Sequence, residues 1–123
     1  MTAITSSRFD LDRFARATEE RDASTQVSMY APDATVTVAD RITQPGSPRV
    51  LQGRAEIAAW IEEVTARDMT HAVQTTVKDD RAAALTVACR YPDGTNVLCA
   101  TVLELRNHTI SNQTVVQVWD ESN

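Results

Sequence analysis

One histidine in a predicted strand has the chemistry of an acid–base catalyst. His71 stands in "MTHAVQTTV", residues 69–77, where alternation is typical of a half-buried strand and groups His71 with Met69, Val73 and Val77. An imidazole titrates near neutral pH and can move a proton at a carbonyl or hydroxyl group of a substrate. The other interpretation is a structural histidine whose ring bonds a backbone group. The pattern leaves both open.

A carboxylate could assist that histidine. Asp40 ends the alternating stretch "DATVTVAD", residues 33–40, and shares a face with Val36 and Val38. It could act as a second base, or it could orient His71 through a hydrogen bond. It could equally be a solvated carboxylate at the end of a strand, because charged side chains are mostly exposed.

Length and charge limit the other functions open to this chain. It has 123 residues, 42% of them hydrophobic, which is enough for a single domain over residues 1–123. The net charge is −5, which argues against nucleic acid and anionic membranes as partners, since both need a basic surface. No apolar run approaches the roughly 20 residues of a membrane span. The first residues carry no secretory signal pattern, so we expect a cytoplasmic protein.

The sequence offers little to hold a metal or a cofactor. Its two cysteines, Cys89 and Cys99, form no CxxC motif, and its three glycines form no phosphate-binding loop. We therefore expect no metal site, no disulfide framework and no cofactor. Cys99 is expected to pack as a small residue, because no neighbour in the sequence would lower the pKa of its thiol.

Periodicity predicts an α+β protein. Helices are expected at residues 9–22, with Asp10 as the N-cap, and at residues 23–31 and 54–68. Strands are expected at residues 33–40, 69–77, 83–91, 96–105 and 114–119, with a loop rich in proline and glycine over 41–53. Helices followed by a run of antiparallel strands form an α+β pattern.

Three stretches of the chain resemble the nuclear transport factor 2-like superfamily. They are "MYAPDATV" at 29–36, "LQGRAEIAAWIEEV" at 51–64, and "QTVVQVWDE" at 113–121, which is similar to the last strand of SnoaL-like sequences. Within the superfamily, the chain looks closest to SnoaL-like proteins and ketosteroid isomerases. The resemblance implies a cone-shaped, curved and mainly antiparallel sheet packed on three N-terminal helices, as in the cystatin-like α+β barrel. This fold hosts several kinds of enzyme as well as proteins without activity.

The resemblance also assigns the positions at which ketosteroid isomerases carry their catalytic groups. Those enzymes use a tyrosine in the first helix, an aspartate base in the first strand and a protonated aspartate in a late strand. The matching positions here hold Phe14, Val38 and Thr101. A phenyl ring and a valine can neither donate to an enolate oxygen nor carry a proton. Steroid isomerisation by that mechanism is therefore not expected.

The predicted pocket is apolar with a few polar groups. The resemblance places Tyr30, Trp60 and Trp119 in its wall, and strand alternation adds Cys99, Thr101 and Gln117. Such a pocket is the usual form of a small-molecule site. One function that fits is a cofactor-independent isomerase, cyclase or dehydratase acting on a small apolar carbonyl or hydroxyl compound such as a polyketide, with His71 and Asp40 as catalytic residues. The other is a non-catalytic domain that binds a hydrophobic ligand or serves as a dimeric interaction module.

Two predicted strands are apolar on both faces. Beyond the pocket-facing residues, outward positions hold Leu98, Ala100 and Val102 in one strand and Val116 and Val118 in the next. An antiparallel sheet with one wet face should alternate apolar and polar residues, and contiguous exposed apolar patches usually mark an interface. We expect an isologous homodimer through this outer face. Many members of the superfamily that the chain resembles pair in this way.

Overall fold

The computed structural model describes residues 8–121 of the chain. We predicted that the first residues carry no secretory signal. This prediction concerns a segment that begins in residues 1–7, which lie outside the described residues. Within residues 8–121, three helices and six strands follow one another along the chain. Their bounds are α1 Leu11–Glu19, α2 Ala23–Ser28, β1 Tyr30–Ala39, β2 Arg49–Gln52, α3 Arg54–Thr65, β3 Thr70–Lys78, β4 Ala82–Arg90, β5 Asn96–Arg106 and β6 Thr109–Trp119.

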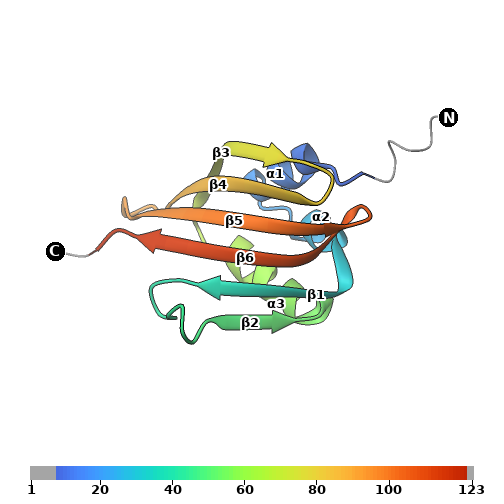
Figure 1. Cartoon of the computed structure of the whole chain (residues 1–123). Helices are drawn as coiled ribbons and strands as arrows, with labels where there is room; N and C mark the ends of the chain where they lie inside the picture. Colours follow the sequence, from blue (N-terminus) through green and yellow to red (C-terminus); the bar gives the residue numbers. More distant parts are fainter. Residues whose placement is uncertain (1–7, 122–123) are drawn as a thin grey trace.

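The strands form one curved sheet in the order β2-β1-β6-β5-β4-β3 (Figure 1). Strands β3 to β6 are joined as antiparallel hairpins, and β2 pairs antiparallel with β1. The pairing of β1 with β6 is parallel, with Val38 opposite Val115. The predicted α+β class with a mainly antiparallel sheet is therefore confirmed.

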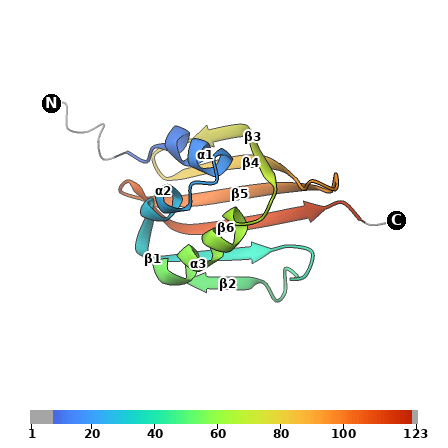
Figure 2. The ribbon, with the colours of Figure 1, turned by 180° about the vertical axis from the view of Figure 1, so that it is seen from behind.

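All three helices cover the same face of the sheet, as Figure 2 shows from behind. Helix α1 starts at the predicted N-cap, because the Asp10 carboxylate accepts a hydrogen bond of 3.0 Å from the backbone N–H of Arg13. The Asp22 carboxylate caps α2 in the same way, accepting from the Thr25 N–H at 3.1 Å. From α1, Leu11 and Phe14 are buried against the sheet. The opposite face of the sheet carries no helix within the described residues (Figure 1).

Several element boundaries differ from the prediction, and three of the differences matter most for the sheet. Strand β2 lies inside the stretch 41–53 that was predicted as a loop, and pairs with β1. Helix α2 ends at Ser28, and β1 begins at Tyr30 although Pro32 follows. The strand accommodates this proline because its register with β6 shifts between Tyr30 and Thr35. Strand β6 starts at Thr109, five residues before the predicted 114.

Val77 does not lie on the predicted inner face of the sheet, because β3 contains a β-bulge. The register between β3 and β4 shifts between Val73 and Thr75, so the alternation of side chains reverses there. Val77 was expected beside His71 on the inner face, but 61% of its surface is exposed. The carboxylate of Glu19, at the end of α1, accepts a hydrogen bond of 2.9 Å from the Val73 N–H at the bulge.

The outward positions predicted to be apolar on β5 and β6 are exposed on the outer face of the sheet. The exposed fractions are 49% for Leu98, 50% for Val102, 46% for Val116 and 64% for Val118. The register places Leu98 opposite Val118 and Ala100 opposite Val116, so these side chains form one patch across β5 and β6. The homodimer itself stays a prediction. Among residues 8–121, no helix is long and apolar enough to cross a membrane.

Candidate functional site

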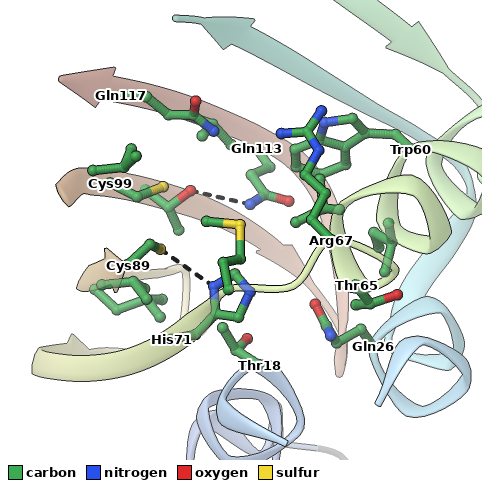
Figure 3. A pocket seen from close by; sticks show the side chains of 18 of the residues that line it. Thr18, Gln26, Trp60, Thr65, Arg67, His71, Cys89, Cys99, Gln113 and Gln117 are labelled. Atoms are coloured by element: carbon green, nitrogen blue, oxygen red, sulfur yellow. Dashed lines mark hydrogen bonds between the residues drawn. The ribbon is translucent and has the colours of Figure 1, made fainter. Parts of the chain in front are cut away.

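A half-open pocket lies between the helices and the inner face of β3, β4, β5 and β6 (Figure 3). The hollow has a volume of about 850 Å³ when its open mouth is included. Of the residues predicted from the sequence, the following line it: Phe14, Tyr30, Trp60, His71, Cys99, Thr101, Gln117 and Trp119.

Val38 and Asp40 were also predicted at the site, and neither is among the lining residues. Val38 is buried in the core at 1% exposure. Asp40 lies just beyond the end of β1, where its carboxylate accepts hydrogen bonds from the N–H groups of Ile42 and Thr43 at 2.9 and 3.0 Å. Within residues 8–121, it makes no hydrogen bond or ion pair with His71. The strand ends before Asp40, so its side chain serves the turn instead of facing inward.

His71 contacts a cysteine instead of a carboxylate. Its Nδ1 lies 3.2 Å from the Sγ of Cys89, its direct neighbour on β4 (Figure 3). Its Nε2 is buried and has no hydrogen-bond partner within the described residues. Burial lowers the pKa of His71 below its ordinary value of 6.5, and the positive charge of Arg21 lowers it further. The imidazole is therefore neutral at pH 7.

The cysteines of the pocket are protonated thiols. Burial raises the pKa of Cys89 to about 11. Burial also raises the pKa of Cys99 to about 12, with a smaller contribution from Cys89. A thiol of this kind is a weak nucleophile at neutral pH. Both side chains therefore act as small, polarisable parts of the wall.

A chain of buried hydrogen bonds forms one side of the pocket. The Tyr30 hydroxyl donates to Oε1 of Gln113. The Gln113 Nε2 donates to the Thr101 hydroxyl at 3.0 Å, the dashed line at Gln113 in Figure 3. This hydroxyl donates to the backbone oxygen of Thr114 at 3.3 Å. Exposed fractions are 1% for Tyr30, 5% for Gln113 and 6% for Thr101. The polar groups of this side are thus ordered by one another.

Aromatic rings and arginines stand at the mouth. Tyr91 stacks on Trp119 with ring centroids 5.7 Å apart, and the guanidinium of Arg41 lies 4.4 Å from the Trp119 ring. The indole N–H of Trp119 donates to the Gln117 side chain at 3.0 Å. Arg67 is anchored to Glu63 at 3.0 Å. These contacts hold the rim of the pocket in place.

Several lining residues were missed by sequence reasoning, among them Gln26, Arg67 and Gln113. Gln113 falls before the predicted start of its strand, although it is in period with Val115 and Gln117. Extending the alternation by two residues would have found it. Gln26 and Arg67 come from the helical side, where no alternation marks the inward face. Within residues 8–121, no three His, Cys, Asp or Glu side chains gather in a group that could hold a metal ion.

The family model of the SnoaL-like domain matches residues 11–113, so the chain belongs to the SnoaL-like family. This agrees with the resemblance seen in the sequence. No protein with a curated description matches the chain.

Solved structures share the fold at low sequence identity. A candidate ketosteroid isomerase from Kribbella flavida has a TM-score of 0.73 and 18% identity, over 92% of this chain and 76% of that one. An NTF2-like protein of unknown function from Mesorhizobium loti has a TM-score of 0.76 and 12% identity, over 88% and 87%. The epoxide hydrolase/cyclase-like enzyme SalBIII, of pyran ring formation in the polyether salinomycin, has a TM-score of 0.68 and 19% identity, over 88% and 87%. Such identities show a common fold and leave the reaction open.

Proposed function

We propose that this protein binds a compact, mainly apolar small molecule in the pocket between the helices and the sheet. One observation carries the proposal: the surface of the pocket is mainly apolar, and three of its polar side chains, Tyr30, Gln113 and Thr101, are joined by buried hydrogen bonds. Ligand sites typically combine an apolar wall with a few ordered polar groups. The neighbour SalBIII, an epoxide hydrolase/cyclase-like enzyme of polyether formation, supports a polyketide-like ligand.

Thermal unfolding in the presence of 2-indanol and 2-indanone tests this binding. A ligand that binds the folded state at ten times its Kd stabilises it by about 1.4 kcal/mol, which raises Tm by roughly 3–6 °C for a chain of this length. Cys99→Phe, which fills the pocket, should remove the rise. Ala59→Phe, on the exposed side of α3, is the matched control and should keep it. If neither compound raises Tm, or if both variants respond like the original protein, the pocket does not bind such molecules.

A second candidate function is acid–base catalysis by His71 on the bound molecule. The observation that favours it is the buried, unpartnered Nε2 of a neutral imidazole in the pocket wall. A neutral imidazole can accept a proton, and a positioned base typically contributes on the order of 100- to 10,000-fold to the rate. Asp40 has no part in this proposal, because its carboxylate is used by the turn after β1.

Exchange of the α-protons of 2-indanone in D₂O, followed by NMR, tests the second candidate. The protein should accelerate the exchange beyond the buffer rate, and His71→Gln should remove the acceleration. His108→Gln, which changes an exposed histidine, is the control and should exchange like the original protein. Equal rates with and without the protein would exclude His71 as a base toward this ketone while leaving the binding proposal intact.

A further inference from the structure

The direction of every hydrogen bond in the buried chain is fixed by its last member. The backbone oxygen of Thr114 can only accept, so the Thr101 hydroxyl must donate its hydrogen there. The Thr101 oxygen then accepts from Gln113, which must present its NH₂ group to it. The Gln113 amide oxygen consequently faces Tyr30 and accepts the tyrosine hydrogen. This order follows from the backbone carbonyl, which has no hydrogen to donate.

The proton of Tyr30 is therefore already used. Burial raises the pKa of Tyr30 far above its ordinary value, so the hydroxyl stays neutral and keeps its single hydrogen. That hydrogen points to Gln113 and cannot at the same time stabilise a carbonyl or enolate oxygen of a ligand. Tyr30 lines the pocket, so a ligand that reaches its oxygen meets a lone pair and no free hydrogen. Tyr30 thus acts as an acceptor.

The neighbouring amide keeps one unused donor. Gln113 has two N–H groups, and one of them donates to Thr101. Its nitrogen and oxygen are bonded to the same carbon, so the amide nitrogen and the tyrosine oxygen lie near one another, and both residues line the pocket. One ligand oxygen can contact both. A hydroxyl is the group that can donate to Tyr30 and accept from Gln113 with a single oxygen.

We propose that Tyr30 and Gln113, oriented by Thr101, make this side of the pocket selective for a hydroxyl group over a carbonyl. The inference rests on the proposed binding of a small molecule and names the group recognised at one end of it. The ligand is an apolar alcohol or phenol whose hydroxyl reaches the chain. Thr101 is a positioning residue, since it acts on the ligand through the Gln113 amide.

The binding of 2-indanol and 2-indanone, measured by NMR titration, tests the selectivity, because the two compounds have the same carbon skeleton and are both achiral. The alcohol can make one hydrogen bond to Tyr30 that the ketone cannot. A net hydrogen bond corresponds to a preference of about 2- to 10-fold in Kd. Tyr30→Phe should remove the preference. Gln113→Leu frees the tyrosine hydrogen, which the ketone oxygen can then accept as the alcohol oxygen can, so the preference for the alcohol should shrink.

Thr101→Val provides an independent variant if Gln113→Leu does not fold. It leaves Tyr30 and Gln113 in place but releases the amide to turn over, so the preference for 2-indanol should shrink. If Thr101 had a purely structural role, Thr101→Val would weaken the binding of both compounds by the same factor and would leave the ratio of their Kd values unchanged.

The outcomes separate the two proposals. If both compounds bind with equal affinity to the original protein, or if the ratio is the same in all variants, the hydroxyl selectivity is wrong and the binding pocket stands. If neither compound binds while the protein is folded, the pocket proposal fails and the selectivity fails with it.

Discussion

Removing the Tyr30 hydroxyl should destabilise the fold, even without any ligand. Tyr30→Phe keeps the ring, which packs edge-on against Phe14 with centroids 6.3 Å apart. It leaves Oε1 of Gln113 without its donor at a site where that side chain is 5% exposed. A buried polar atom left unpaired costs about 1–3 kcal/mol. At about 4 °C per kcal/mol for a chain of this length, Tm should fall by roughly 4–12 °C.

Urea denaturation followed by circular dichroism measures this free energy, and Tyr91→Phe is the matched control. The Tyr91 hydroxyl meets the exposed Arg67 guanidinium at 3.5 Å, so its loss should change the free energy of unfolding by less than about 0.5 kcal/mol. The double variant Tyr30→Phe with Gln113→Leu removes both partners and should cost less than the sum of the two single variants, by about 0.5–3 kcal/mol. Equal effects of Tyr30→Phe and Tyr91→Phe, or strict additivity in the double variant, would refute the buried chain.

The remaining predictions concern the outer face and the titration of His71. We propose that the apolar patch on β5 and β6 joins two copies of this chain, so sedimentation at micromolar concentration should give a mass of twice the 13.5 kDa of the chain. Val116→Lys should split the dimer, and Ile42→Lys, in an exposed loop, should leave it intact. A monomeric original protein would exclude this interface. The pKa of His71 lies below 6.5 in the folded state, so the unfolded state binds the proton first. The contribution of neutral His71 to the free energy of unfolding is present above about pH 6.5 and is lost as the pH falls toward the folded-state pKa. The free energy of unfolding then falls by at most about 1.4 kcal/mol per pH unit. His71→Gln should therefore lose less stability than the original protein between pH 7.5 and 5.5, and equal losses would contradict the burial of the imidazole.

Local patterns were sufficient to predict most of the fold. Alternation identified β3 to β6 as strands because each has one face on the core, and Asp10 marked the start of α1 because its carboxylate caps the helix. Strand β2 was missed because it has only four residues within a stretch rich in proline and glycine. The predicted face of Val77 was wrong because a bulge is defined by the register with the partner strand, and the alternation within one strand does not reveal it.

The candidate site was predictable where side chains follow a strand and not where they depend on contacts between elements. His71, Cys99, Thr101 and Gln117 line the pocket because alternation places them inward. The pairing of His71 with Cys89 depends on the register between β3 and β4, which the sequence does not specify. The direction of the hydrogen bonds from Tyr30 likewise depends on three segments that meet only in the folded chain. The catalytic role of His71 stays a prediction.

The parallel pairing of β1 with β6 has a consequence for how the chain folds. Strands β3 to β6 are linked by short turns, so each of their pairings closes a small loop. Joining Val38 to Val115 instead closes a loop of about 77 residues, and such distant contacts slow folding because the entropy of closing the loop is lost before any contact is gained. We therefore expect the meander to form first and the segment that carries β1 and β2 to dock onto it afterwards. Substitutions at this seam should accelerate unfolding more than they slow folding.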